Sequence, residues 1–155
     1  MVVIIAPHTS MLDFIIGKLY YLSIKRKSKF IIKKELFFFP LGLILKMMGA
    51  IPVDRKKGGM IFRDIIKKFN ESDEFILNIT PEGTRKKVSK WKRGFYDIVK
   101  EANVPLAIGC IDYGKKQIGI MTMFDISGDF SKDIIKIKNL YKDVQGRHPE
   151  NFTVV

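Results

Sequence analysis

The sequence predicts an α/β domain with a mixed, mostly parallel sheet flanked by helices. Short apolar runs of strand length alternate along the chain with longer segments whose apolar residues recur every three or four positions. This alternation is typical of parallel sheets. The 155 residues suit one ordinary domain with a real core, and they include no linker, repeat or low-complexity segment. We therefore expect a single domain over residues 1–155.

The first half of the chain is predicted to open on a strand that is buried on both faces. Residues 2–6 are small or β-branched and apolar, and the run ends at Pro7. A largely apolar helix is expected over 11–22, with Thr9 or Ser10 as its cap. No signal peptide or anchor is predicted ahead of the strand. The elements expected next are a strand over 30–32, a short helical piece over 43–48, a strand over 50–53 and a helix after Gly58-Gly59.

The second half of the chain continues the alternation. A short apolar strand is expected over 75–79, and a later helix with an apolar stripe can end at Asn103, ahead of a strand over 106–111. The remaining elements expected are closing strands over 117–122 and 124–126 and a terminal helix around 134–140. Successive short strands with no helix between them predict an antiparallel portion of the sheet between residues 106 and 126.

The apolar stretch over residues 36–53 needs a separate interpretation. It contains one charge, Lys46, and its 18 residues are near the lower limit for a membrane span, which usually needs roughly 20. Prolines and glycines at positions 40, 42, 49 and 52 divide it, which favours buried or interfacial packing over a span. Three adjacent rings at 37–39 cannot all face one interior. We therefore expect at least one phenylalanine to point outward, toward lipid or an acyl chain.

A histidine and a carboxylate lie at the end of the first strand, where α/β proteins keep their chemistry. His8 precedes the predicted helix, and Asp13 lies in its first turn. Residues five apart on one helix point about 140° away from each other, but a loop ahead of the helix can fold the imidazole back onto Asp13. The carboxylate would hold one ring nitrogen and leave the other free to take a proton from a substrate hydroxyl. The alternative is a strand-end histidine beside a first-turn acid favoured by the helix dipole.

A second polar loop follows the strand predicted over 75–79. Thr80-Pro81 leads into Glu82-Gly83-Thr84-Arg85. The guanidinium and the hydroxyl of such a tight loop can grip a phosphate, because arginine offers bidentate donors to an oxyanion. Alone, the segment is a turn with charged residues, in which the arginine merely braces the loop. Together with His8 and Asp13 it predicts a site.

Four blocks of this sequence, in order, resemble the glycerolipid acyltransferases related to lysophosphatidic acid acyltransferase. The blocks are His8 to Asp13, the apolar stretch over 49–55, the loop over 81–85 and the apolar strand that carries Pro105. The similarity also extends through residues 34–37, 91–96, 112–113 and 149–152, so it covers nearly the whole chain. The combination is far more specific than any one block, and it implies a glycerol-3-phosphate acyltransferase-like fold.

The resemblance implies a role for each matching residue. His8 looks like the general base that deprotonates the acceptor hydroxyl, and Asp13 like the residue that orients it. The residues that resemble the binding surface for the acceptor's phosphate are Arg55, Glu82, Gly83, Thr84 and Arg85, with Arg85 as the direct contact. The donor would be an acyl thioester of coenzyme A or acyl carrier protein, attacked directly by the acceptor alcohol. No metal, further cofactor or covalent enzyme intermediate is expected.

The resemblance also implies an acceptor of the lysophosphatidic acid type and a place in phospholipid biosynthesis. Glycerol 3-phosphate and a lipid without phosphate are the alternatives within the family. Relatives often carry an N-terminal helical segment that meets the membrane, and no such segment is predicted here. We expect a peripheral enzyme on the inner face of the membrane. The single cysteine, Cys110, agrees with a reducing cytoplasmic setting because it excludes an internal disulfide.

The net charge of +12 requires an anionic partner, and nucleic acid or an acidic membrane surface would serve equally well. A noncatalytic basic module that binds nucleic acid or acidic lipid through charge alone is therefore the rival interpretation. Such a binder has no need of His8 paired with Asp13 ahead of the loop over 82–85. This favours the enzyme, with an anionic membrane surface and no nucleic acid as partner. Cys110 and His148 are interpreted as structural.

Overall fold

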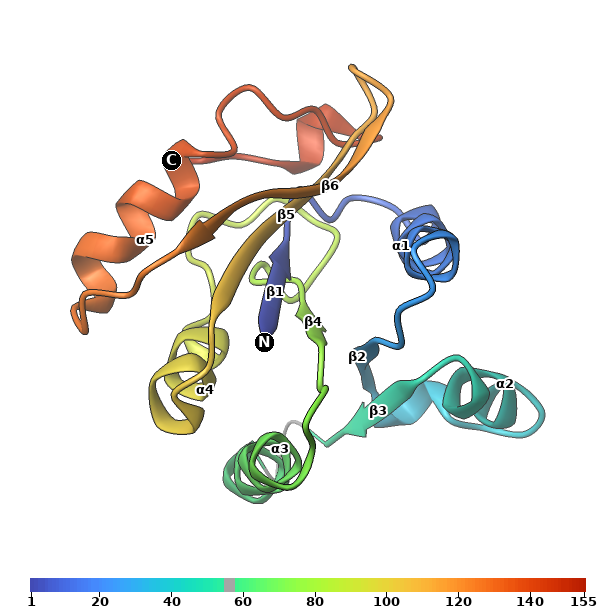
Figure 1. The fold of residues 1–155 in the computed structure, drawn as a ribbon. Coiled ribbons are helices and arrows are strands. Elements are labelled where there is room, and N and C mark those ends of the chain that lie inside the picture. The colour runs from blue at the N-terminus through green and yellow to red at the C-terminus, as the bar shows by residue number, and fades with distance from the viewer. Residues whose placement is uncertain (55–57) are drawn as a thin grey trace.

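The computed structural model describes residues 1–54 and 58–155 of the chain (Figure 1). Strands and helices alternate along most of it, as the hydrophobic pattern predicts. The elements, in chain order, are β1 (Val2–Ile5), α1 (Leu12–Ser23), β2 (Lys29–Lys33), the short 3-10 helix η1 (Lys34–Leu36), α2 (Leu41–Met47), β3 (Ala50–Val53), α3 (Gly58–Glu71), β4 (Leu77–Ile79), α4 (Gly94–Ala102), β5 (Leu106–Asp112), β6 (Gln117–Phe124), α5 (Phe130–Asn139) and the 3-10 helix η3 (Pro149–Asn151).

The strands form one mixed sheet in the order β3-β2-β4-β1-β5-β6. Neighbours from β3 to β5 pair in parallel, and only β6 pairs antiparallel, with β5. The parallel central strand β1 has Val2 opposite Leu77 of β4 on one side and Leu106 of β5 on the other. The predicted α/β class, the mostly parallel sheet and its antiparallel end are therefore confirmed.

The order of the strands decides which helix covers which face of the sheet. From β1 the chain crosses through α1 to β2 and through α2 to β3, moving toward one edge, and then returns through α3 to β4 and through α4 to β5. Because parallel crossovers are right-handed, the outward and return helices lie on opposite faces. Figure 1 shows α1 on one side of the sheet and α3 and α4 on the other.

The main hydrophobic core lies between the sheet and helices α3, α4 and α5, which cover one of its faces. Central strand residues such as Val2 and Leu106 are fully buried there, against Phe95 and Tyr96 of α4 and Ile137 of α5. The opposite face has a smaller aromatic cluster, in which Phe14 and Tyr21 of α1 meet Phe30 of β2 edge to face. Burial of these rings holds α1 in place, and with it the loop that precedes the helix.

Two local predictions differ from the structure, and a third is confirmed. Residues 124–126 do not form a second closing strand: β6 runs unbroken to Phe124, and the chain then turns into α5. β4 is shorter than the apolar run over 75–79, and begins at Leu77. Asn103 does end α4, in the left-handed conformation with φ of 49°, as predicted.

The apolar stretch over 36–53 is divided among the end of η1, helix α2 and strand β3. The exposed fraction is 58% for Phe38 and 88% for Phe39, which confirms that the three adjacent rings do not all face the interior. Among the helices in the described part of the chain, none is long and apolar enough to cross a membrane.

Candidate active site

Three of the predicted site residues, His8, Asp13 and Glu82, come together at the point where the chain leaves the two central strands in opposite directions. β1 and β4 are parallel neighbours, but the chain after β1 enters α1 on one face and the chain after β4 leads to α4 on the other. The loops after such strands diverge and leave a crevice at their carboxyl ends, where ligands bind in open α/β sheets. His8 follows β1 and Glu82 follows β4, and their hydrogen bond joins the two loops: the His8 backbone N–H donates to Glu82 Oε1 at 2.9 Å.

The structure brings His8 and Asp13 into direct contact. His8 Nδ1 lies 3.0 Å from Asp13 Oδ2, and the two side chains are 21% and 4% exposed. The contact forms because α1 begins at Leu12, so His8 lies in the loop and Asp13 in the first turn. An ionised carboxylate can only accept hydrogen bonds, so Nδ1 is the donor. Nε2 is then the unprotonated nitrogen of the neutral ring, and the imidazole remains partly accessible.

Asp13 is held by four hydrogen bonds. Its Oδ2 also accepts from the backbone N–H groups of Thr9 and Ser10, both at 2.9 Å. Burial by itself raises the pKa of Asp13, but the hydrogen bonds from His8, Tyr113 and Ser10 outweigh it and keep the pKa below its usual value. The carboxylate therefore stays ionised at neutral pH, in an orientation that the loop backbone sets. The expected cap at Thr9 or Ser10 is wrong, because Met11 occupies the N-cap position of α1 without a capping side-chain hydrogen bond. Ser10 Oγ accepts from the Leu12 N–H at 3.2 Å.

Tyr113 is a member of the site for which sequence analysis assigned no role. It follows β5, and its hydroxyl donates to Asp13 Oδ1 at 2.7 Å. Burial and the hydrogen bond to Asp13 raise the pKa of Tyr113, so the phenol stays protonated as a donor. The sequence signals for Tyr113 are its place at the carboxyl end of a strand and the resemblance over residues 112–113, and neither identifies Asp13 as its partner. The partners lie 100 positions apart.

Glu82 lies beneath the His8 loop and not on an open phosphate-binding surface. Its exposed fraction is 5%, and Oε2 has no hydrogen-bond partner among the described residues. Burial raises the pKa of Glu82 to about 7, against the hydrogen bond from the His8 backbone, which lowers it. The visible contact of Glu82 is to the backbone of the residue that carries the imidazole.

The buried Glu82 carboxyl should make stability depend on pH. Its pKa is raised in the folded state, so its contribution is fully present below the unfolded value of about 4.5 and is lost as the pH rises through about 7. At about 1.4 kcal/mol per pKa unit, the loss approaches roughly 3 kcal/mol. We expect the free energy of unfolding of Glu82→Gln, relative to the wild type, to rise from pH 5 to pH 8 by up to about that amount.

Urea unfolding at both pH values measures this difference. Glu101→Gln, which removes an exposed carboxyl from the end of α4, is the matched control and should follow the wild type. Parallel pH dependences for the wild type and Glu82→Gln would mean that Glu82 stays ionised in the fold.

The rest of the loop after β4 is exposed enough to meet a ligand. Gly83 has φ of 63°, and a Cβ there would lie 2.8 Å from the side chain of Lys92, so this position favours glycine. Arg85 is exposed, and among the described residues it takes no part in the hydrogen bonds around His8. Thr84 Oγ1 accepts from the Lys86 N–H at 3.3 Å. Arg55, the fifth residue predicted to bind phosphate, lies outside the described residues.

The C-terminal segment supports the His8 loop from the side of β5. The His148 backbone N–H donates to Thr9 Oγ1 at 3.1 Å, and the Tyr113 N–H donates to the Gln145 carbonyl at 2.8 Å. Gly146 is buried between them, and a Cβ there would lie 2.9 Å from Thr9 Oγ1. Residues 145–148 thus hold the loop and the strand end that carries Tyr113. His148 contributes its backbone to this arrangement, while its ring lies 3.6 Å from the carboxylate of Glu150.

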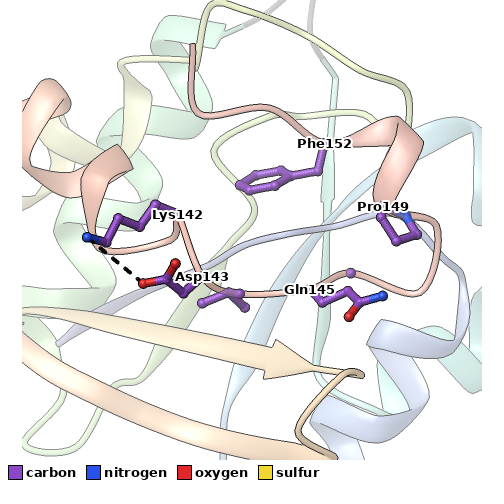
Figure 2. A pocket seen from close by; sticks show the side chains of 7 residues that line it. Lys142, Asp143, Gln145, Pro149 and Phe152 are labelled. Carbon is purple, nitrogen blue, oxygen red and sulfur yellow. Dashed lines mark ion pairs between the residues drawn. The ribbon is translucent and has the colours of Figure 1, made fainter.

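A pocket of about 290 Å³ lies beside this C-terminal segment. Figure 2 shows the Lys142 and Asp143 side chains paired on one side of it and Phe152 on another. None of the predicted site residues lines it, and the two ionisable side chains in its lining, Lys142 and Asp143, pair with each other. The His8 loop is therefore the candidate active site. Within residues 1–54 and 58–155, no group of three or more side chains of the metal-binding types comes together.

Comparison with known proteins identifies a family for most of the chain. Residues 1–111 match the model of a protein family described as Acyltransferase. No curated protein and no solved structure matches the chain. The match runs from β1 almost to the end of β5 and includes His8, Asp13 and the loop over 82–85. Tyr113 and the C-terminal segment lie beyond it.

Proposed function

Because this chain belongs to the acyltransferase family, we propose that it moves a fatty acyl group from an acyl thioester to the hydroxyl of a lysophosphatidic acid-like acceptor. The observation that carries the proposal is the His8 imidazole in the loop after β1, which a hydrogen bond joins to the loop after β4. Its Nδ1 is held by the buried Asp13 carboxylate, which leaves Nε2 free. This is the arrangement of a general base with its orienting group and without a protein nucleophile.

In the proposed reaction, Nε2 of His8 takes the proton of the acceptor hydroxyl as the oxygen attacks the thioester carbonyl carbon. Asp13 stabilises the imidazolium that forms, and its bonds to Thr9, Ser10 and Tyr113 hold it in position. The tetrahedral adduct then expels the thiolate as its carbon–sulfur bond breaks, and the imidazolium returns the proton to sulfur. Atoms and charge balance with donor and acceptor alone, so the reaction needs no further cofactor.

We propose that the exposed part of the loop after β4 binds the acceptor's phosphate. Arg85 and Thr84 supply a guanidinium and a hydroxyl, and the buried Glu82 fixes the start of the loop. Arg55 remains in the proposal on the strength of the sequence pattern. A free phosphate ester such as glycerol 3-phosphate would use the same groups, and the acceptor panel below distinguishes the two.

Replacing Arg85 by alanine should raise the Michaelis constant for the acceptor by about tenfold or more, because a charged hydrogen bond to phosphate is lost. Arg85→Lys should restore the affinity only in part, since an ammonium does not make the bidentate contact. Initial rates with one substrate varied at a time separate acceptor from donor. Lys87→Ala, a neighbouring exposed cation, is the control. An effect confined to the donor would assign Arg85 to the other half of the site.

Acyl transfer with a small panel of substrates tests the proposed function directly. The acceptors are lysophosphatidic acid, glycerol 3-phosphate and monoacylglycerol, and the donors are acyl thioesters of coenzyme A and acyl carrier protein. We expect transfer to lysophosphatidic acid and less to the acceptor that lacks phosphate. Preference for glycerol 3-phosphate would change the acceptor but retain the mechanism. Absence of transfer to all three acceptors would contradict the proposal.

A lipid acceptor also requires access to a bilayer. The net charge of +12 suits a membrane surface with anionic headgroups, where each basic side chain near the surface contributes about 1 kcal/mol. We propose that the enzyme acts from the cytoplasmic side, as a peripheral protein on the inner face of the membrane.

A further inference from the structure

The outward face of α1 is apolar where a surface helix ordinarily carries charges. Leu12, Ile15, Leu19 and Leu22 follow one another at spacings of three and four, so they form one stripe along the helix. Their exposed fractions are 37%, 48%, 60% and 67%. The helix contains two charged residues, and of these Asp13 is buried in the site. α1 thus has apolar side chains on both its inner and its outer face.

The segment that leads through α2 presents a second apolar surface. The exposed fractions are 88% for Phe39, 59% for Leu43 and 81% for Met47. The right-handed crossovers that carry the chain from β1 to β2 and on to β3 place α1 and α2 on the same side of the sheet. In Figure 1 both helices lie away from α3, α4 and α5. We call the outward sides of α1 and α2, with Phe38 and Phe39, the α1–α2 face.

Basic residues lie around this face. Acidic residues are rare in the segment that forms it, although the exposed Glu74 pairs with Arg26 just beyond the end of α1. Residues 1–53 contain eight lysines and arginines but only two acidic residues. One of these is Asp13, which is buried, so Glu35 is the only exposed carboxylate of the segment. Lys25 and Lys27 are exposed just beyond the end of α1, and Lys46 is exposed on α2. An apolar centre with a cationic rim matches the acyl and headgroup layers of an anionic bilayer.

The face also reaches the site. The stripe begins at Leu12, which directly precedes Asp13, and it leads away from the His8 loop toward the end of α1. A bilayer that lies along the helix would therefore come close to the His8 loop. A second copy of the chain would fit less well, because a two-fold contact through this face would bring its lysines against each other.

We propose that the α1–α2 face is the surface by which the domain lies on a bilayer with anionic headgroups. Its apolar side chains enter the interface, and its lysines contact the headgroups. The purpose of this contact, delivery of a lipid acceptor to His8, rests on the proposed function. The contact itself can be measured without any assay of acyl transfer.

Sedimentation with vesicles tests the docking surface. The probes are vesicles of phosphatidylcholine alone and of phosphatidylcholine with an equal share of phosphatidylglycerol. We expect binding to the mixed vesicles that high salt weakens, and about tenfold or greater weakening in a variant with Ile15→Gln, Leu19→Gln and Leu22→Gln. Glutamine preserves helix propensity at these positions. The matched control is Met60→Gln with Ile135→Gln, because each side chain is 62% exposed on a helix outside this face.

Two outcomes would overturn the proposal: equal weakening by the control variant, or unchanged binding of the α1 variant. Association of the wild type into dimers that the α1 variant abolishes, without vesicle binding, would identify a second copy as the occupant. A second measurement keeps the test decisive if the α1 variant unfolds. A fluorophore that responds to polarity is attached at Leu22→Cys in one protein and at Met60→Cys in another, both in a Cys110→Ala background. Mixed vesicles should shift the emission of the first probe to shorter wavelength and leave the second unchanged.

Activity then separates this proposal from the proposed function. The α1 variant should lose more turnover with an acceptor embedded in vesicles than with a short-chain acceptor below its micellar concentration. Equal losses on both would reject the docking role while leaving acyl transfer in place. Vesicle binding through this face without any acyl transfer would retain the docking surface and reject the proposed function.

Discussion

Replacement of His8 by alanine is expected to lower turnover by about 10² to 10⁴, the range typical for loss of a general base. The reason is that Nε2 is the proton acceptor in the proposed reaction, and alanine has no group that can take the proton. The affinity for the thioester should change little, because the ring holds the acceptor hydroxyl and not the donor. Initial rates at a saturating concentration of the thioester donor measure the loss of turnover. A thermal melt of the same variant shows whether the fold is retained.

His148→Ala is the matched control, because His148 is the second of the chain's two histidines. Its ring is half exposed and faces Glu150, while its link to the site loop is a backbone N–H that alanine retains. This variant should keep wild-type turnover. Activity of His8→Ala within a few fold of the wild type would remove His8 from the proposed mechanism.

Asp13→Asn should reduce turnover to a similar extent, about 10² to 10⁴, while the fold is retained. An asparagine can turn its carbonyl oxygen toward the donors at His8, Thr9 and Ser10 and its amide toward the Tyr113 hydroxyl. The geometry survives, but the charge that stabilises the imidazolium is lost. Asp97→Asn, which removes a carboxylate paired with Arg93 on the surface of α4, should leave turnover unchanged.

A double variant of His8 and Asp13 tests whether Asp13 acts only by orienting the His8 imidazole or also contributes to catalysis independently. Asp13 acts through the imidazole, so His8→Ala with Asp13→Asn should be about as slow as His8→Ala alone, because residues that act as a unit are not additive. Multiplied losses would show that Asp13 contacts the substrate separately. A large fall in melting temperature for Asp13→Asn alone would instead assign the carboxylate to the structure of the loop.

Part of the candidate site could be predicted from the sequence. The pairing of His8 with Asp13 was predictable, because strand, loop and first helical turn are consecutive and each has a local signal. The loop after β4 was predictable as polar and tight for the same reason. Glu82 was expected on the phosphate surface, but the structure places it beneath His8. A charged residue in a polar loop is ordinarily expected at the surface. The burial of Glu82 follows from the pairing of β4 with β1, which no residue near Glu82 indicates.

The sequence by itself determined the succession of strands and helices along the chain and the α/β class. It also determined the antiparallel end of the sheet and the places of His8 and Asp13 in a loop and a first helical turn. All of these depend on residues close together in the chain, where periodicity and turn chemistry act. The tertiary structure alone decided the contacts of Glu82 with His8, of Tyr113 with Asp13 and of His148 with Thr9, which join positions 74, 100 and 139 apart. Such contacts follow from the order of strands in the sheet, and that order depends on the packing of the whole core, so no local pattern encodes it.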